Sequence, residues 1–393
     1  MALDRCIINS ILITLILIVL YYWIYCEDIE EMINIKPIKG QIKWVRNKKC
    51  KYKMSKTVQD VINSNHMEKG KGENWNVHFP CTYNNIDDEI DNIDTSTSAD
   101  DQRMFIIHNA DQISSKSAIW RNLINYYGRD RANNLMPDTY QLFKKEDRDL
   151  FNNEFCPNKL YILKKNLQRQ TGIEITNDKN KIMNGYKNGY VVVQELLQDP
   201  YLVDNRKINM RVYLLIICKD GELEAYVHRD GFMYYTAEYF KKKSLKTGPN
   251  ITTGYIDRQV YIDNPLTLED FRKYLDKPSR SFNNKEKELI KNKQIISEYT
   301  FSKINELIKN IVMGVNPSIC MNDKIKKNIS FQLFGADIAL SDTLVPKLME
   351  INKGPDLGAK DIRDSEVKHS VVTDMFKVIK IINDDDHNFI QVL

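Results

Sequence analysis

The segment 331–357, FQLFGADIALSDTLVPKLMEINKGPDL, limits the possible folds more than any other part of the chain. Two apolar runs flank a polar turn near Thr343, a pattern typical of a β-hairpin that is buried on at least one face. Such a hairpin places Asp337 opposite Glu350. Because side chains two apart on a strand leave the same face, Asn352 lies beside Glu350. The segment therefore predicts a hairpin that gathers three oxygen-bearing side chains.

Two carboxylates and an amide oxygen on apolar strands indicate a site for a hard cation. Buried acids are costly unless they are paired or bind a metal, and Mg²⁺ prefers oxygen ligands that it can share with phosphate groups. We therefore expect Asp337, Glu350 and Asn352 to bind Mg²⁺. The alternative is an edge hairpin whose acids face water, and residue spacing alone does not separate the two interpretations.

Apolar runs of strand length recur earlier in the chain, at 160–163, 191–197 and 211–218. The Asp-Gly pair at 220–221 follows the third run and predicts a tight turn, because it tolerates the positive φ that such a turn requires. We therefore expect 211–218 to pair antiparallel with 223–228.

Helices are predicted where apolar residues recur at i, i+3, i+4 and i+7, as they do in 304–314 and 367–379. Thr267, followed three residues later by Asp270, approximates an N-terminal cap for another helix. Strands and helices mixed in this order predict an α+β or α/β fold.

Residues 6–26 carry no charge and gather aromatic side chains at one end. A helix of about 20 apolar residues spans a bilayer, so we expect one membrane anchor here. A cleaved signal peptide is the alternative, but its apolar region is shorter and is followed by small residues. Arg5 stands alone before the segment, whereas four cations follow it between 36 and 46. The positive-inside rule therefore places the large C-terminal part in the cytosol.

Changes in polarity divide the chain into five expected regions. They are a short tail (1–5), the transmembrane helix (6–26), a basic juxtamembrane linker (27–60), a small and partly irregular N-terminal domain (61–158) and a region with the clearest strand and helix patterns (159–393). The cations of the linker can contact anionic lipid, or they are simply solvated.

Charge and cysteine usage exclude some classes of function. Lys and Arg number 57 against 53 for Asp and Glu, and this formal charge of +4 is too balanced to predict a nucleic-acid partner. The seven cysteines are dispersed, with no CxxC pair. We therefore expect reduced thiols in a cytosol-facing domain rather than a zinc or redox site.

Four segments match, in order, the successive motifs of a known family. They are YILKKNLQRQTGI (161–173), VVQELLQDPYLVDNRKINMRVYLLI (192–216), AYVHRDGFMYYTAEYF (225–240) and the hairpin segment (331–357), with MPDTYQL (136–142) before them. Together they resemble the tubulin–tyrosine-ligase-like family, over about residues 135 to 385. That family comprises ATP-grasp amino acid ligases, which include tyrosine ligases, polyglutamylases and glycylases. The resemblance implies an ATP-grasp catalytic region at 159–393.

The resemblance also implies a set of cofactor contacts. Carried over residue by residue, the family's magnesium site falls on the same three hairpin residues, Asp337, Glu350 and Asn352. Lys164 matches a lysine that contacts nucleotide phosphates, and 194–197 matches the hinge that grips adenine. The residues assigned to ATP in this way are Lys164, Arg169, Gly172, Gln194, Glu195, Leu196, Leu197, Lys207 and Asn209.

Three arginines are candidates for catalysis. Lys207, Asn209 and Arg211 alternate along one strand, so their side chains leave one face, which is either an active-site wall or a solvent-facing side. The resemblance places nucleotide and acceptor contacts there. Arg229 matches an arginine near the reacting phosphate and the incoming amino acid, and a surface ion pair is its alternative. The resemblance thus implies Arg211, Arg229 and Arg169 as catalytic residues.

The chain departs from the family pattern at several of these positions. Its phosphate loop keeps Arg169 and Gly172 but lacks the paired glycines around the arginine. Glu195 stands where the hinge usually carries a lysine, and Asn209 replaces an aspartate. These departures bear on how a nucleotide is held.

The resemblance implies an ATP- and Mg²⁺-dependent ligase that adds an amino acid, first of all glutamate, to carboxylates of an acidic protein such as tubulin through an acyl phosphate. Such a reaction needs no nucleophile from the enzyme. Two alternatives stay open: a membrane-anchored pseudoenzyme that binds nucleotide or a partner as a scaffold, and a small-molecule carboxylate–amine ligase.

Overall fold

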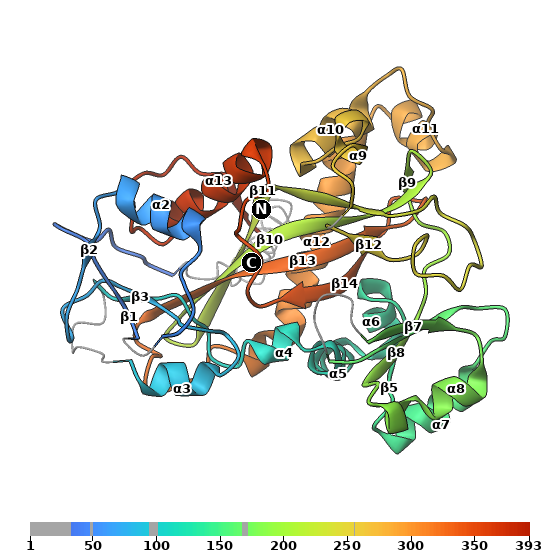
Figure 1. Cartoon of the computed structure of the whole chain (residues 1–393), viewed down its shortest axis with the longest axis horizontal. Helices are drawn as coiled ribbons and strands as arrows, with labels where there is room; N and C mark the ends of the chain where they lie inside the picture. Colours follow the sequence, from blue (N-terminus) through green and yellow to red (C-terminus); the bar gives the residue numbers. More distant parts are fainter. Residues whose placement is uncertain (1–32, 48–49, 94–100, 167–171, 255) are drawn as a thin grey trace, which may run out of the picture. The chain divides into compact units, whose positions relative to one another are not determined.

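The structure, a computed structural model, describes residues 33–47, 50–93, 101–166, 172–254 and 256–393 (Figure 1). From Ile35 to Leu393 these residues form one compact unit. The predicted membrane helix at 6–26 lies outside the described residues. Within the described ranges, every helix is too short or too polar to cross a bilayer.

The larger of two sheets contains eleven strands in the described ranges. They are β1 (Lys43–Arg46), β2 (Glu68–Lys69), β3 (Val77–Phe79), β4 (Arg103–Met104), β9 (Leu202–Val203), β10 (Arg206–Lys219), β11 (Glu222–Thr236), β12 (Thr252–Thr253), β13 (Ile329–Leu340), β14 (Pro346–Asn352) and β15 (Phe389–Gln391). The main order is β12-β11-β10-β13-β4-β3-β1-β2, and β14, β15 and β9 pair with β13, β11 and β10.

Three long strands form the centre of this sheet. β10 lies between β11 and β13 and is antiparallel to both. Every residue of β13 is buried, as is typical of a strand with both faces covered. β10 and β11 are joined at Asp220 and Gly221, which have φ angles of 55° and 92°. The predicted Asp-Gly hairpin is therefore confirmed.

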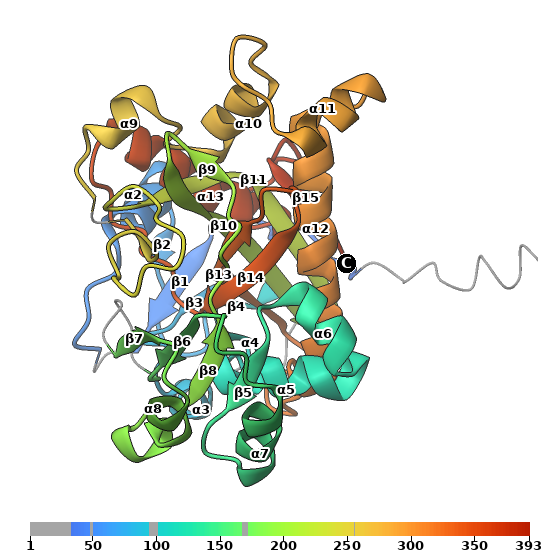
Figure 2. The ribbon, with the colours of Figure 1, turned by 90° about the vertical axis from the view of Figure 1, so that its right-hand side faces the viewer.

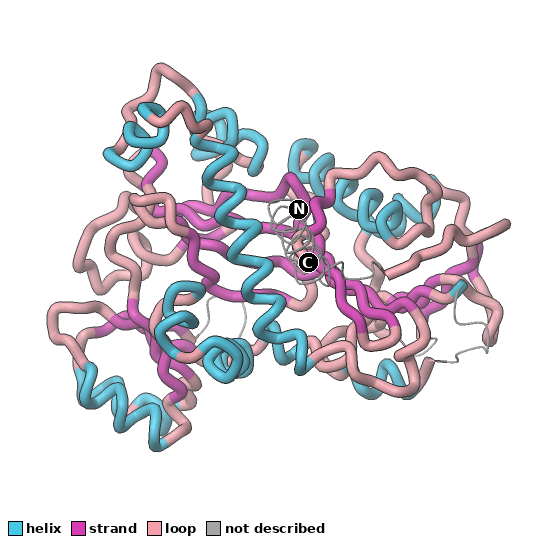
Figure 3. Tube along the Cα trace, turned by 180° about the vertical axis from the view of Figure 1, so that it is seen from behind, coloured by secondary structure: helices cyan, strands magenta, loops and turns pink. Residues whose placement is uncertain are grey.

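Helices cover both faces of the large sheet. The helices of the described ranges, which pack on the large or the small sheet or connect strands, are α2 (Lys56–Ser64), α3 (Ile86–Asp91), α4 (Asp111–Ser114), α5 (Lys116–Tyr127), α6 (Arg129–Leu135), α7 (Lys145–Glu154), α8 (Lys179–Met183), α9 (Val260–Asp263), α10 (Leu268–Asp276), α11 (Asn284–Lys291), α12 (Ile296–Val315) and α13 (Ile362–Val378), with 3-10 turns at Gly185–Asn188 and Asn316–Ser318. Seen from the side, α12 lies on one face of the sheet and α13 with α2 on the other (Figure 2). From behind, α12 crosses the full width of the central strands (Figure 3).

The predicted helices are confirmed. The apolar stripe of α12 is buried from Ile304 to Ile311, and α13 buries Val367, Val371 and Met375. α10 begins with a complete capping box, in which Thr267 and Asp270 satisfy each other's backbone N–H groups.

The smaller sheet consists of four antiparallel strands. They are β5 (Thr139–Gln141), β6 (Tyr161–Lys164), β7 (Ile173–Thr176) and β8 (Val192–Glu195), in the order β5-β8-β6-β7. One face packs on α7 and α8. The other face carries Ile162 and Leu196. Because side chains alternate along a strand, Lys164 and Gln194 lie on this second face. The mixed α/β fold predicted from the sequence is confirmed.

The N-terminal strands belong to the same sheet as the hairpin. β4 pairs in parallel with both β3 and β13, and β1 pairs with β3. The region predicted as an N-terminal domain, 61–158, thus adds strands to both sheets. The predicted linker, 27–60, contains β1 and the start of α2, so its second half is folded.

The prediction of reduced thiols is wrong for two pairs of cysteines. Disulfides join Cys50 to Cys81 and Cys218 to Cys320, and among the described cysteines only Cys156 is free. The pairs are 31 and 102 residues apart in sequence, while their Cα atoms lie 5.3 and 5.6 Å apart. Local spacing motifs such as CxxC cannot reveal pairs that only the tertiary fold brings together.

Candidate active site

The hairpin of β13 and β14 forms as the sequence predicts. Asp337 pairs with Glu350 and Gly335 pairs with Asn352 in the strand register. The Glu350 side chain hydrogen-bonds to those of Asp337 and Asn352. The structure therefore brings together the three predicted metal ligands.

Arg211 joins this cluster from the neighbouring strand. It lies opposite Asp337 on β10, and its Nε and Nη2 donate to the two carboxylate oxygens of Asp337 at 2.6 and 3.2 Å. Burial alone would lower the pKa of Arg211, but the carboxylate outweighs burial and raises it. A Cβ at Gly335 would lie 2.9 Å from Arg211 Cδ, so the missing side chain gives the arginine room to cross β13.

The two carboxylates are in different electrostatic environments. Burial raises the pKa of Asp337, and the arginine only partly opposes it. Burial would also raise the pKa of Glu350, but Lys116, Lys164 and Arg211 together lower it. The pKa of Glu350 is thus lowered while that of Asp337 is raised, and an added cation would favour the ionised form of both carboxyl groups.

Two buried lysines lie close together near the cluster, and Lys164 faces its carboxylates. Lys164 is 7% exposed and Lys207 is 3% exposed. Burial lowers the pKa of each to about 8, and repulsion between the two contributes to the shift of Lys207. Lys164 Nζ donates to Gln194 Oε1 at 2.5 Å, whereas Lys207 has no ion-pair partner among the described residues. Two desolvated cations side by side are costly for a fold and typical of a site that binds phosphate.

The predicted hinge lies at the edge of the small sheet. Gln194 Nε2 donates to Thr139 Oγ1 at 2.7 Å, which fixes the amide that holds Lys164. Leu196 is buried on the apolar face, and Leu197 is half-buried. This apolar face suits the ring of a nucleotide base.

The donor set fits Mg²⁺. Two carboxylates and one amide are hard oxygen ligands, and such sites leave further positions to water and phosphate oxygens. No group of three or more His, Cys, Asp or Glu side chains in the described ranges could hold a metal, so the asparagine is needed to complete the set.

The comparisons with known proteins agree with this geometry. The model of the tubulin-tyrosine ligase family matches residues 93–388, well over half of the chain. The chain belongs to the tubulin-tyrosine ligase family. The resemblance drawn from the sequence motifs is therefore confirmed.

Curated relatives in this family are named as tubulin polyglutamylases. A probable tubulin polyglutamylase of Caenorhabditis elegans, ttll-9, is 28% identical over 48% of this chain and 42% of its own length. A probable beta-tubulin polyglutamylase of Tetrahymena thermophila is 24% identical over 62% of this chain and 20% of its own. Human tubulin polyglutamylase TTLL7 is 24% identical over 50% of this chain and 23% of its own. The chain thus matches less than half the length of each of these relatives.

Two departures of this family member have visible consequences. Glu195 lies on the face of β8 opposite to Gln194, and its carboxylate pairs with Lys159 at 2.6 Å. Asn209 faces the site beside Arg211, and its Oδ1 is buried with no hydrogen-bond partner in the described part of the chain. An unsatisfied buried amide oxygen costs stability unless a ligand supplies a donor, so this atom fits a bound nucleotide or amino acid.

The structure does not bring Arg229 to the cluster. Its side chain is 58% exposed and lies near Glu269, with 3.9 Å between Nε and a carboxylate oxygen. It lines a cavity of about 690 Å³ with Val212 and Phe301 on the α12 face of the sheet. Arg211, one residue from Val212, points to the opposite face. The predicted catalytic role of Arg229 therefore has no support in the geometry.

The phosphate loop is only partly described. Arg169 lies outside the described residues. Gly172, with a φ of 73°, closes the base of the loop because its carbonyl accepts from Lys165 N at 2.9 Å. A Cβ at Gly172 would lie 2.8 Å from Lys165 Cβ, so only glycine fits this position.

Sequence reasoning missed two residues of the site. Lys116, the first residue of α5, lies 3.6 Å from a carboxylate oxygen of Glu350. The Tyr234 ring lies under the guanidinium of Arg211, 5.2 Å from centroid to Cζ. No local spacing marks Lys116. The alternation of β11 could have indicated Tyr234, because its register partner is Asn209.

Proposed function

We propose that this protein is an ATP- and Mg²⁺-dependent ligase that joins an amino acid, first of all glutamate, to a carboxylate of an acidic protein such as tubulin. One observation carries the proposal. In a member of the tubulin-tyrosine ligase family, buried Lys164 faces the hairpin carboxylates that hold Arg211, and a second buried lysine, Lys207, lies near Lys164.

The roles of the residues follow from their chemistry. Asp337, Glu350 and Asn352 would hold Mg²⁺, and the two lysines would bind nucleotide phosphates. The nucleotide would lie as in other ATP-grasp sites, with its base on the apolar face of the small sheet. ATP would supply the phosphoryl group that turns an acceptor carboxylate into an acyl phosphate, with release of ADP. The amine of the donor would then attack the acyl carbon and release phosphate as the amide bond forms.

Arg211 is the main candidate for positioning the reacting groups. Its guanidinium is held by Asp337 on one side and by the Tyr234 ring on the other. A planar guanidinium fixed in this way can bind a carboxylate or a phosphate oxygen with little loss of entropy. Arg229 takes no role in this proposal.

Exposed cations favour an acidic acceptor. The loop between β11 and β12 exposes Lys241, Lys243 and Lys246, and it begins two residues after Tyr234 in the site. Several cations at one edge of a site attract an acidic segment at physiological salt. This local charge is more relevant than the overall charge of +4.

The test is incorporation of labelled amino acids into tubulin by the full chain with ATP and Mg²⁺. We expect glutamate incorporation with ADP release, and loss of both when Asp337→Ala and Glu350→Ala are combined. Asp342→Asn, in the exposed turn of the same hairpin, is the matched control and should stay active. The ligase proposal fails if no donor amino acid is incorporated and no ADP is released.

The second candidate is a nucleotide-binding scaffold. It is favoured by Asn209, which replaces a charged residue of the family, and by the engagement of Asp337 with Arg211. Thermal stabilisation by ATP without turnover would support it. ADP release without any protein acceptor would instead indicate a small-molecule ligase.

We also propose that 6–26 anchors the protein in a membrane. Two features predict opposite orientations: the cations after the segment favour a cytosolic catalytic unit, whereas disulfides persist in oxidising compartments. Protease protection of intact vesicles decides between them, because a lumenal unit survives digestion until detergent is added.

A further inference from the structure

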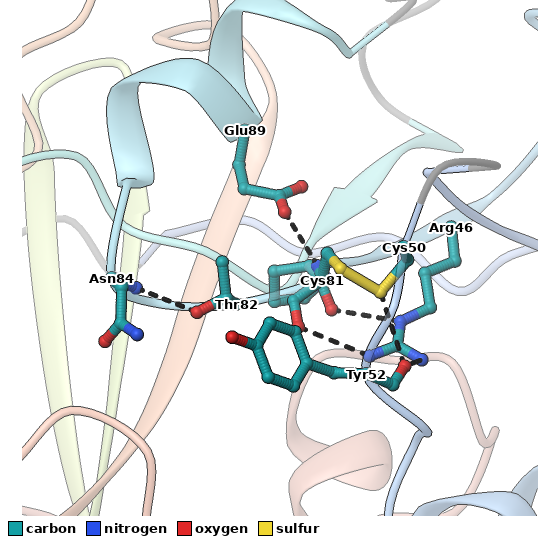
Figure 4. The surroundings of a disulfide bond; sticks show 8 residues. Arg46, Cys50, Tyr52, Cys81, Thr82, Asn84 and Glu89 are labelled. Carbon is teal, nitrogen blue, oxygen red and sulfur yellow. Dashed lines mark hydrogen bonds between the residues drawn. A yellow bond between two sulfur atoms is a disulfide. The ribbon is translucent and has the colours of Figure 1, made fainter.

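The Cys50–Cys81 disulfide lies in a part of the chain that the family match, 93–388, does not include. β1 and β3 run parallel, with Arg46 opposite Phe79, and one cysteine follows each strand. The disulfide therefore closes the ends of two neighbouring strands (Figure 4).

Hydrogen bonds hold the surroundings of this disulfide. The Arg46 guanidinium donates to the carbonyls of Tyr52 at 2.7 Å and Pro80 at 3.2 Å, and a Glu89 carboxylate oxygen accepts from Cys81 N at 3.0 Å (Figure 4). Burial raises the pKa of Glu89 and lowers that of Arg46, because both charged groups are partly removed from water beside the disulfide.

The disulfide segment contacts the loop that follows the metal ligands. A Cβ at Gly354 would lie 2.9 Å from the Tyr83 ring, two residues after the disulfide, so the ring lies directly against the loop backbone. From α2, Thr57 Oγ1 donates to Leu357 O at 2.6 Å. The loop begins at residue 353, directly after Asn352.

A cavity of about 310 Å³ lies where the disulfide segment meets the loop. Its lining includes Cys81 and Thr82 from the segment and Pro355 and Asp356 from the loop. Besides the Gln332 amide, which donates to Lys353 O at 2.7 Å, the Tyr83 and Thr57 contacts hold this loop, and the covalent bond limits how far the segment that carries Tyr83 can move.

We propose that the Cys50–Cys81 disulfide is a redox-sensitive clamp on the loop 353–357, and through it on the metal-binding end of β14. Two cysteine thiols lose two protons and two electrons as the Sγ–Sγ bond forms, and one glutathione disulfide takes them up to become two glutathione thiols. Reduction removes the covalent link between the ends of β1 and β3, loosens the contact of Tyr83 with the loop, and weakens Mg²⁺–nucleotide binding without removing a ligand. This inference uses the site of the proposed function but not its acceptor or donor.

The first measurement needs no activity. The full chain is equilibrated in glutathione buffers of different redox ratio, its thiols are alkylated and mapped by mass spectrometry, and amide hydrogen exchange is followed at 353–357. We expect Cys50 and Cys81 to be protected in the oxidised protein, and exchange at the loop to become about tenfold faster on reduction. Free alkylation of both cysteines in the oxidised protein would overturn the proposal.

The second measurement compares two disulfides. In oxidising buffer, the variant with Cys50→Ser and Cys81→Ser should show the fast loop exchange of the reduced wild type. Its affinity for Mg²⁺–ATP should be several-fold weaker than that of the oxidised wild type and should no longer change with the glutathione ratio. Cys218→Ser with Cys320→Ser is the matched control, and its loop should still respond. The clamp is refuted if loop exchange in the variant with Cys50→Ser and Cys81→Ser still changes with the glutathione ratio. It is also refuted if that change is lost only in the variant with Cys218→Ser and Cys320→Ser. If no variant binds nucleotide, the proposed function fails, while the exchange data still decide on the clamp.

Discussion

Lys207 carries a buried charge that forms no ion pair among the described residues, so replacing it should make the protein more stable and, under the proposed function, less able to bind nucleotide. Its side chain is 3% exposed, without an ion-pair partner in the described ranges, and burial lowers its pKa from 10.5 to about 8. At ~1.36 kcal/mol per pKa unit, this shift corresponds to a destabilisation of roughly 3 kcal/mol at pH 7. Lys207→Met keeps the length of the side chain and removes that cost.

The pH dependence of this effect has a definite sign. Between pH 8 and 10.5 the unfolded chain keeps the proton of Lys207 while the native protein has released it, so the stability of the wild type rises with pH. The advantage of Lys207→Met should therefore fall from roughly 3 kcal/mol at pH 7 to below about 1 kcal/mol at pH 10.

Urea unfolding of the full chain at pH 7, 8, 9 and 10 measures this difference. Lys241→Met, at an exposed lysine, is the control and should change stability by less than ~0.5 kcal/mol at every pH. In parallel, Lys207→Met should weaken ATP binding at least tenfold. A variant that is less stable than the wild type at pH 7, or a difference that does not change with pH, would refute this account.

Three further predictions concern other charged and packed groups. Glu286→Gln breaks a buried ion pair with Arg280, 2.7 Å long, and should cost ~3 kcal/mol in urea unfolding; a loss under ~1 kcal/mol contradicts this. Gly335→Ala pushes against Arg211 Cδ, and should reduce ligation and ADP release tenfold with the fold intact by circular dichroism; unchanged rates contradict it. Because the pKa of Lys164 is about 8, ATP affinity should fall above pH 8 in titration calorimetry, and a flat profile to pH 9.5 would exclude this role.

Patterns confined to one short segment predicted structure well. The hairpin around Thr343 and the capping box of Thr267 depend on neighbours within a few residues, and both form as expected. The proximity of Asp337, Glu350 and Asn352, the three predicted metal ligands, belongs to the same class, because two adjacent strands and the alternation of side chains are enough to place them together.

Features that depend on the pairing of distant strands were not predictable. Arg229 faces away from the site because Phe232, not Arg229, is the register partner of Arg211, and a single sequence does not show that register. Lys116 reaches Glu350 from a helix more than 200 residues earlier in the chain. The two disulfides likewise join cysteines that only the tertiary fold brings together, and the sequence pattern does not show which cysteines pair.

The bidentate bond between Arg211 and Asp337 affects the order in which ligands assemble. Both oxygens of Asp337 already have a resident positive charge, so a divalent ion that arrives alone has to compete for them. A metal ion that arrives bound to a triphosphate brings negatively charged oxygens with it. The Arg211 guanidinium can then bind these oxygens in place of Asp337. Under the proposed function, the site would take up Mg²⁺ as a complex with nucleotide, and free Mg²⁺ should saturate it poorly in the absence of ATP.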